Sequence, residues 1–209
     1  MTDDERCLWR MTPSQEGLYR RLQSALSAAQ TRQRPLLLTG DVGVGKTFLA
    51  QRLAPSQAGY YNIARDFFPQ LLADNALQAV TPEAVVRLVS SLAETCSSPY
   101  AVVDGFEPLV SMWAGQRPEK VSTFLYVLSR TIMERPLLVV VHTCPEHVPE
   151  GILRQVNKWW PADRRFALCL TQADIEVVAR NLGLDPMRKI EVKKSLYELM
   201  AMKLERADE

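Results

Sequence analysis

Cysteine and histidine are scarce in this sequence, and neither is grouped as a metal or redox site would require. Among 209 residues there are only two histidines, His142 and His147. The four cysteines are scattered along the chain: Cys7, Cys96, Cys144 and Cys169. Zinc sites need three or four matched ligands, and redox motifs pair cysteines at C-x-x-C spacing. We therefore predict free thiols in a reducing compartment and histidines with structural roles.

The sequence also lacks a long apolar run and an excess of either charge. No hydrophobic stretch approaches the roughly 20 residues of a transmembrane helix. The N-terminal MTDDERCLWRM does not have the basic-then-apolar pattern of a signal peptide. Lys and Arg total 25 against 24 Asp and Glu, which gives a net charge of +1. We therefore expect a cytoplasmic protein with no membrane contact, in which any nucleic-acid surface is local.

The residues that are present fit one α/β domain with at most a small appendage. The chain is 47% hydrophobic and 23% charged, which is enough for a sizeable core. The predicted strands are Leu36–Thr39, Tyr60–Ala64, Tyr100–Val103, Leu137–Val141 and Arg165–Leu170. They alternate with helical segments, and this alternation predicts a parallel sheet with helices on both faces and a ligand at the strands' carboxyl ends.

The helix boundaries are marked by Thr-Pro pairs, prolines and glycines. The predicted helices span Thr12 to about Thr31, Phe48–Leu53, Pro82 to about Cys96, Pro118–Met133, Glu150–Trp160 and Thr171–Gly183. In Pro118–Met133 the apolar stripe includes Ile132. We predict that Gly105–Arg117 is an apolar loop, either folded under the domain or contacting a partner, and that a final helix begins at Asp185.

One motif dominates the chain: LLLTGDVGVGKTFLA, Leu36–Ala50. It has the spacing G-x-x-x-x-G-K-T of a phosphate-binding loop between an apolar strand and a helix. Glycines let the backbone N–H groups curl around an anion, and the helix that follows adds its positive dipole end. The residues predicted to contact the nucleotide are Gly40, Asp41, Val42, Gly43, Val44, Gly45, Lys46, Thr47 and Phe48. Lys46 is expected to reach the β- and γ-phosphates, and the Thr47 hydroxyl to bind Mg²⁺.

A second motif is the aspartate that ends the third predicted strand. Tyr100–Val103 lead directly into Asp104, so the strand delivers a carboxylate at its carboxyl end. This is the Walker B pattern, in which the aspartate holds Mg²⁺ near the phosphates. We therefore predict ATP and Mg²⁺ as ligands, with Thr47 and Asp104 on the metal. No guanine-recognition motif N/T-K-x-D is present where it would be expected, which favours adenine.

With these motifs the chain resembles an AAA+ ATPase of the broader ASCE-type P-loop NTPases, from Thr12 to about Gly183. The resemblance implies a five-stranded parallel core over residues 1–170 and a short helical lid over residues 171–209. It implies a polar sensor at the end of the fourth strand, for which we favour Thr143 over His142. It also implies an arginine finger at Arg164 or Arg165 that acts on a neighbouring subunit, and hence a nucleotide-dependent homo-oligomer.

Two departures from the family pattern weaken the prediction of hydrolysis. Gly105 follows Asp104 where the family has the glutamate that activates water, and Glu107 is the nearest candidate to replace it. The segment after Leu170 is shorter than a full lid. Arg188 therefore matches either the lid's sensor arginine or, as we favour, a solvated helix charge.

One short stretch, Asn157–Trp160 with Arg154, Arg164 and Arg165 nearby, combines aromatic and basic residues. Such a cluster either stacks on single-stranded nucleic acid or packs one tryptophan into the core. We favour packing, because the net charge is close to zero.

Three functions remain open at this point. The first is an ATPase, with Lys46, Asp104, Glu107, Thr143, Arg164 and Arg165 as its catalytic set. It would act as an oligomeric remodelling or loading factor with a protein partner in a DNA-linked system. The candidate systems are replication, transposition and phage defence of the BREX type. BREX systems include small P-loop accessory ATPases. The second is a small-molecule or nucleotide kinase. The third is an adaptor that binds nucleotide with little hydrolysis.

Overall fold

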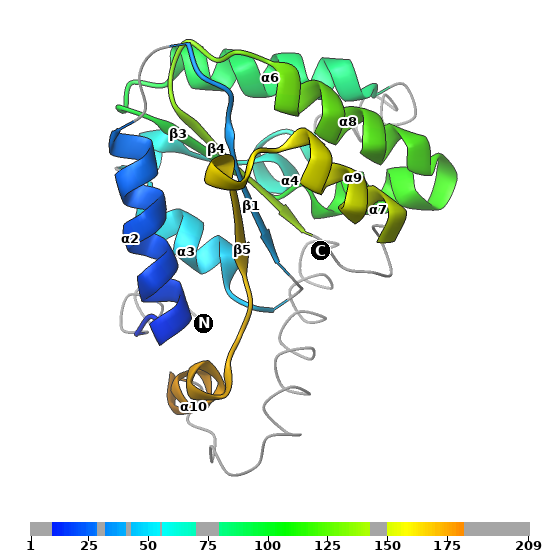
Figure 1. Ribbon diagram of the computed structural model, residues 1–209. Helices are drawn as coiled ribbons and strands as arrows, with labels where there is room; N and C mark the ends of the chain where they lie inside the picture. The colour runs from blue at the N-terminus through cyan, green and yellow to red at the C-terminus, as the bar shows by residue number, and fades with distance from the viewer. Residues whose placement is uncertain are drawn as a thin grey trace.

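Five parallel strands form one sheet in the computed structural model (Figure 1). The structure describes residues 10–28, 32–40, 43–54, 56–69, 80–142 and 150–181. The strands are β1 (Leu36–Gly40), β2 (Tyr60–Asn62), β3 (Ala101–Asp104), β4 (Leu137–His142) and β5 (Arg165–Leu168). They are arranged in the order β2-β3-β4-β1-β5, and each neighbouring pair is parallel. The predicted α/β class, with its five-stranded parallel sheet, is confirmed.

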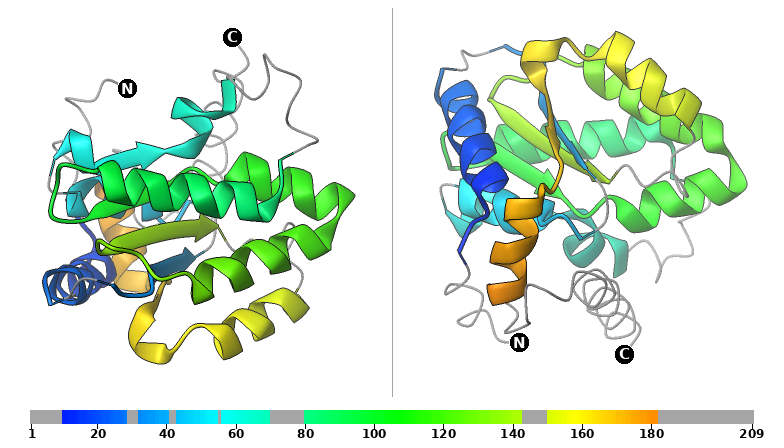
Figure 2. Two further views of the ribbon diagram at one scale, coloured as in Figure 1. Left: turned by 90° about the horizontal axis from the view of Figure 1, so that it is seen from above. Right: turned by 60° about the horizontal axis from the view of Figure 1, so that its bottom comes forward.

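Helices cover both faces of this sheet. They are α2 (Pro13–Ser27), α3 (Lys46–Leu53), α4 (Ile63–Asp66), α6 (Pro82–Thr95), α7 (Glu107–Gln116), α8 (Pro118–Arg130), α9 (Glu150–Trp159) and α10 (Gln172–Asn181). Successive side chains of a strand point to opposite faces, so each strand serves two cores. Leu36 and Leu38 pack with α2 and α3, whereas Leu37 packs on the other face with α6, α7 and α8. Figure 2 shows these two helical layers on either side of the sheet.

The central strands β1 and β4 place the main motif. Both are buried apolar runs, as a strand covered on two faces requires, and Leu38 pairs in register with Val140. Because β4 lies between β1 and β3, the carboxyl ends of these three strands share one edge of the sheet. This edge, toward the bottom of Figure 1, carries Gly40 and Asp104.

The leading helix begins as predicted and ends earlier. Thr12 caps α2, and Gln15 completes a capping box with it. The helix ends at Ser27 rather than near Thr31, and its buried stripe is Leu18, Leu22 and Leu26.

The prediction that Gly105–Arg117 is a loop is wrong, because Glu107–Gln116 form α7. Its apolar residues recur at helical spacing and are buried: Phe106, Leu109, Val110 and Trp113. Pro108 fits the first turn of a helix. These side chains therefore belong to the core and do not form a partner-contact surface.

Two further boundaries differ from the prediction. The second strand ends at Asn62 rather than Ala64, because the Asn62 side chain accepts a hydrogen bond from the Arg65 amide and starts α4. Helix α8 ends at Arg130, since Thr131 turns extended. As a result Ile132 does not join the apolar stripe and is 61% exposed.

The C-terminal segment is described only as far as Asn181. Within it α10 contacts α2, at the end of the molecule where the phosphate loop lies (Figure 2). The predicted final helix, Arg188 and the rest of the predicted lid lie outside the described residues, so the boundary at residue 171 stays a prediction.

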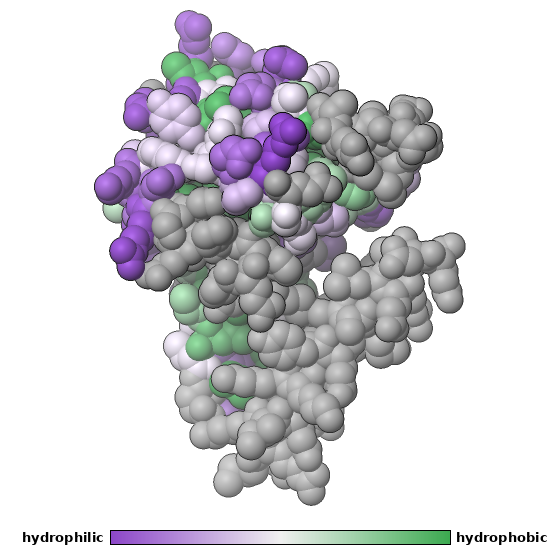
Figure 3. Space-filling view, turned by 90° about the vertical axis from the view of Figure 1, so that its right-hand side faces the viewer, coloured by the Kyte–Doolittle hydropathy of each residue, from purple (hydrophilic) through white to green (hydrophobic). Residues whose placement is uncertain are grey.

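The described surface is mostly polar. Figure 3 shows one face, on which hydrophilic residues predominate and hydrophobic ones form small areas. Among the described residues, no helix combines the length and the apolar character needed to cross a membrane.

Candidate functional site

The predicted phosphate loop joins β1 to α3 as its sequence requires. Gly40 ends β1, and Gly43 and Gly45 adopt left-handed φ angles of 77° and 87° before α3 begins at Lys46. Strand, tight turn and helix N-terminus therefore follow one another within a few residues, which is the context that the motif needs. Asp41 and Val42, also predicted to contact the nucleotide, lie outside the described residues.

Two features favour glycine over any other residue at position 45: its backbone conformation and the side chain beside it. Its φ of 87° is costly for a residue with a side chain. In addition, a Cβ atom at this position would overlap the Gln15 amide. That amide donates a hydrogen bond to the Val44 carbonyl at 3.1 Å, so the loop is packed closely against the start of α2.

Lys46 is only 5% exposed, which is rare for a lysine. It is the first residue of α3, at the end of the helix where the dipole favours negative charge. The two residues after it are half-buried, and the Arg52 guanidinium lies 4.9 Å from the centre of the Phe48 ring. A phosphate group in this loop would place negative charge beside both the lysine and the helix end.

Asp104 is fully buried at the carboxyl end of β3. Its carboxylate accepts hydrogen bonds from the Tyr60 hydroxyl at 3.1 Å and from the Gly105 amide at 2.7 Å. Helix α3 packs against β3, and the Leu53 carbonyl at the end of α3 accepts a hydrogen bond from Tyr100, just before β3 begins. The helix therefore runs against the strand direction, with its start toward the end of β3 that carries Asp104. A carboxylate so placed is suited to hold a hydrated Mg²⁺ beside the phosphates.

Tyr60 is a site residue that the sequence analysis missed. Burial, and then the nearby Asp104 charge, raise the pKa of Tyr60 well above its usual range, so the hydroxyl remains a hydrogen-bond donor. One signal could have placed Tyr60 near Asp104. Tyr60 stands two residues before Asn62 in the edge strand β2, and Asn62 pairs in register with Asp104. Reading that signal requires the knowledge that β2 and β3 are neighbours.

The structure explains why glycine follows Asp104. Gly105 has a left-handed φ of 79°, and a Cβ atom there would overlap the Asn62 side chain. Asn62 is held in place because its oxygen accepts from the Arg65 amide at 2.9 Å. Position 105 therefore has no room for the family's glutamate while Asn62 occupies this place.

The two remaining candidates near this edge are Glu107 and Thr143. Glu107 begins α7, three residues after Asp104, and is half-buried. Thr143 lies outside the described residues, but it directly follows His142, whose backbone pairs in register with Gly40. Both roles stay predictions.

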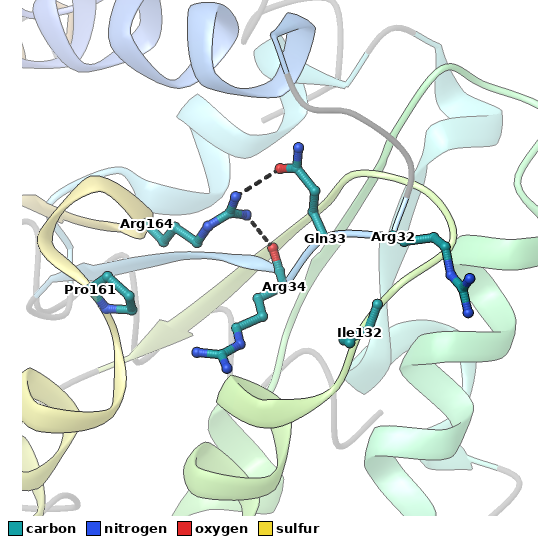
Figure 4. A pocket seen from close by; sticks show the side chains of 6 residues that line it. All are labelled: Arg32, Gln33, Arg34, Ile132, Pro161 and Arg164. Carbon is teal, nitrogen blue, oxygen red and sulfur yellow. Dashed lines mark hydrogen bonds between the residues drawn. The ribbon is translucent and has the colours of Figure 1, made fainter.

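Arg164 and Arg165 lie at the opposite, amino edge of the sheet, where β5 begins. The Arg164 guanidinium donates to the Arg34 carbonyl at 2.7 Å and to the Gln33 side chain at 2.8 Å (Figure 4). Arg165 is hydrogen-bonded to the Asn157 side chain. These arginines are therefore a strand's length away from the phosphate loop of their own chain.

Arg164 borders an open pocket of about 350 Å³ at this amino edge. The residues that line it, shown in Figure 4, are Arg32, Gln33, Arg34, Ile132, Pro161 and Arg164. Arg32 pairs with Glu134 at 3.6 Å. An arginine finger would have to act from this edge on the nucleotide of a second copy.

The predicted basic-aromatic cluster packs as favoured from the sequence. Trp160 is 2% exposed and belongs to the core. Trp159 is half-buried and meets Tyr126 of α8 edge-on, with ring centres 5.4 Å apart. Trp160 is therefore unavailable for stacking on a base, and Trp159 is already in contact with another aromatic ring.

No dedicated metal cluster is found in the described part of the chain. No group of three or more His, Cys, Asp or Glu side chains is placed to hold an ion there. Of the cysteines, Cys96 and Cys169 are free thiols.

No protein-family model matches this sequence, and no curated protein matches it. Among solved structures, the chain is similar to Cdc6p from Pyrobaculum aerophilum, at 17% identity and a TM-score of 0.41, over 87% of this chain and 53% of that one. It is also similar to the Walker-type ATPase Paby2304 of Pyrococcus abyssi, at 14% identity and a TM-score of 0.37, over 88% of this chain and 62% of that one. The chain thus spans less than two thirds of either protein. Similarities at these TM-scores carry no argument, so function is argued from the site residues.

Proposed function

We propose that this protein is an ATPase that binds ATP with Mg²⁺ at the carboxyl edge of its sheet. One observation carries the proposal: a glycine-rich turn leads from β1 into a helix that begins with buried Lys46, while buried Asp104 ends β3 at the same edge. Buried charged side chains are rare in proteins, and they mark functional sites more often than exposed ones do when they stand at the spacing of a nucleotide-binding motif.

The roles of the individual residues follow from their positions. The backbone amides around Gly43 and Gly45 and the start of α3 bind the phosphates, and Lys46 neutralises their charge. Thr47 and Asp104 hold Mg²⁺, the second through water. Bound Mg²⁺ would neutralise charge on the terminal phosphates and help to orient them. Tyr60 and the Gly105 amide keep the Asp104 carboxylate in place by hydrogen bonds.

Hydrolysis requires a base for the attacking water, and Glu107 is our candidate. It stands at the start of α7 on the same side of the sheet as Asp104, where a carboxylate is also favoured by the helix dipole. Thr143 is proposed as the polar sensor that follows β4.

We further propose that copies of the chain assemble on ATP, with Arg164 or Arg165 of one copy facing the nucleotide of the next. The support for this is their position at the amino edge, away from their own loop. A protein client in a DNA-linked system, such as replication, transposition or BREX-type phage defence, is the narrower form of this proposal. A kinase and a non-hydrolysing adaptor are the alternatives.

Measuring molecular mass and phosphate release in the same samples tests these functions. We expect the mass to increase with ATP and Mg²⁺, and turnover per chain to rise with protein concentration. Assembly without turnover would instead identify an adaptor. A constant monomer that transfers phosphate to an added small acceptor would identify a kinase, and either result contradicts the proposed ATPase.

A further inference from the structure

The start of α2 holds an unusual concentration of buried polar side chains. Thr12, Gln15 and Asp174 are all buried, and they lie at the same end of the molecule as buried Lys46. Buried polar groups must be hydrogen-bonded, so the partners of these three residues define what they hold together.

Gln15 joins α2 to the phosphate loop and is 4% exposed. Its side-chain oxygen accepts from the Thr12 amide at 3.0 Å, and its nitrogen donates to the Val44 carbonyl at 3.1 Å. Because the capping box uses the oxygen, the nitrogen is directed to the loop. Val44 stands between the two left-handed glycines, so this bond fixes the most sharply turned part of the loop.

Asp174 joins α10 to α2. Its carboxylate accepts from the Ser14 amide at 2.9 Å and the Ser14 hydroxyl at 2.6 Å. It also accepts from both the amide and the hydroxyl of Thr171, each at 2.6 Å, which caps its own helix. One carboxylate therefore serves the N-termini of two helices, where negative charge is favoured.

These bonds hold the carboxylate ionised. Burial alone would raise the pKa of Asp174, but the hydrogen bonds from Ser14 and Thr171 outweigh it and lower the pKa well below its usual range.

A second contact holds the C-terminal end of α10. The Arg10 amide donates a hydrogen bond to the Asn181 side chain, and the Asn181 side chain donates one to the Arg10 carbonyl at 2.9 Å.

Ser14 and Gln15 are neighbours in one rigid helical turn. The first is bound to α10 and the second to the phosphate loop, although Asp174 and Val44 are distant in the sequence. Figures 1 and 2 place the start of α2 beside α10 in each view. A shift of this turn must therefore affect both contacts.

We propose that the first turn of α2 couples the phosphate loop to α10, so that nucleotide binding and the docking of α10 stabilise each other. This inference rests on the proposed nucleotide site. Gln15 is the positioning residue on the loop side, and Asp174 is the positioning residue on the α10 side. Binding free energies are reciprocal, so loosening α10 must weaken nucleotide binding by the same factor by which nucleotide strengthens docking.

The test is the affinity of the full chain for ADP with Mg²⁺, measured by titration calorimetry. Asp174→Asn keeps the shape of the side chain but removes its charge and replaces one of the two oxygens that accept these hydrogen bonds with an NH2 group, which cannot accept. We expect it to weaken ADP binding by about 5-fold or more, at the lower end of typical coupling. Glu176→Gln, on the exposed side of the same helix, removes an equal charge and should leave the affinity unchanged.

Hydrogen exchange gives the reciprocal readout. ADP should slow exchange of the α10 amides in the parent protein, and this slowing should be lost in Gln15→Ala, which cuts the link on the loop side. If Asp174→Asn does not fold by circular dichroism, Ser14→Ala replaces it, because that variant keeps the amide bond to Asp174 and loses only the hydroxyl bond.

The outcomes separate the two proposals. A parent chain that fails to bind ADP overturns the nucleotide site, and this inference with it. A parent that binds ADP, with faster α10 exchange in the variants but unchanged ADP affinity, overturns the coupling alone. Weaker binding together with the loss of α10 protection supports the coupling.

Discussion

At the scale of single residues, two glycines of the candidate site lie where a neighbouring side chain leaves no room for a Cβ atom. Gly105 is glycine because Asn62 fills the space beside it, and Asn62 is fixed by its bond to the Arg65 amide. This explains a departure from the family pattern that the sequence alone presents only as a missing glutamate. Glu107 therefore stays the proposed catalytic base.

Placing a glutamate at position 105, as the AAA+ pattern has it, should damage the protein. We expect Gly105→Glu to lower the free energy of unfolding by about 1–3 kcal/mol, because of its left-handed φ and the overlap with Asn62. Urea unfolding measures this change. Gly115→Ala is the control, since a Cβ atom there meets nothing within 4 Å and alanine favours the helix. Equal stability of the Gly105 variant and the parent would contradict the steric explanation.

Replacing Glu107 tests the proposed base. We expect Glu107→Gln to slow phosphate release by about 100-fold, because the amide cannot accept a proton, while ATP affinity stays the same. Steady-state turnover and a binding titration on the same preparation separate the two effects. Glu119→Gln, which removes an exposed carboxylate from the first turn of α8, is the matched control. An unchanged rate in Glu107→Gln would remove this residue from the mechanism.

At the scale of elements, local sequence patterns predicted most helices and strands. Where a prediction was wrong, the structure shows the physical cause. Thr12 and Thr81 mark true helix starts, because their side chains cap the amides that a helix leaves free. The apolar stretch of α7, which contains Pro108, was predicted as a loop. The proline in fact occupies a first turn. Contacts between elements, such as Ser14 with Asp174, leave no local pattern to read.

The docking of α10 should depend on pH through Asp174. Its pKa is lowered in the folded protein, so its contribution is complete above the unfolded value of about 3.9 and is lost as the pH falls below it. We expect exchange protection of α10, corrected for intrinsic rates, to fall as the pH decreases from about 4 toward the lowered pKa of the folded protein. Asp66 also has a lowered pKa and would contribute to the pH dependence of the parent protein. Comparing the parent with Asp174→Asn therefore isolates the part of the pH dependence that is due to Asp174. The same pH dependence in that variant would exclude Asp174 as its cause.

At the scale of the whole molecule, the alternation of strands and helices was enough to predict the sheet and the edge that carries the site. The order of the strands was not predictable, and it determines that Tyr60 and Asn62 lie beside Asp104. The placement of Arg164 and Arg165 at the amino edge likewise follows from the parallel sheet. An inter-subunit role for them is a property of an assembly rather than of one chain.

Mixing two inactive variants tests that role. Lys46→Ala lacks a working loop and Arg164→Ala lacks the proposed finger, so we expect each alone to release little phosphate. In a mixed assembly, the intact loop of an Arg164→Ala copy can face the intact arginine of a Lys46→Ala copy. Part of the turnover should therefore return. Arg165→Ala, tested in the same way, determines which arginine acts. No recovery from either mixture would contradict a finger that acts between copies.

The most direct test of the central claim is the affinity for ATP with Mg²⁺ of the parent chain and of Lys46→Ala. Removing the buried charge that we propose to neutralise the phosphates should weaken binding by about 100-fold or more. Lys158→Ala, which removes an exposed lysine from α9, should bind like the parent. Circular dichroism confirms that each variant is folded. Unchanged affinity in folded Lys46→Ala would contradict the assignment of this loop as the nucleotide site.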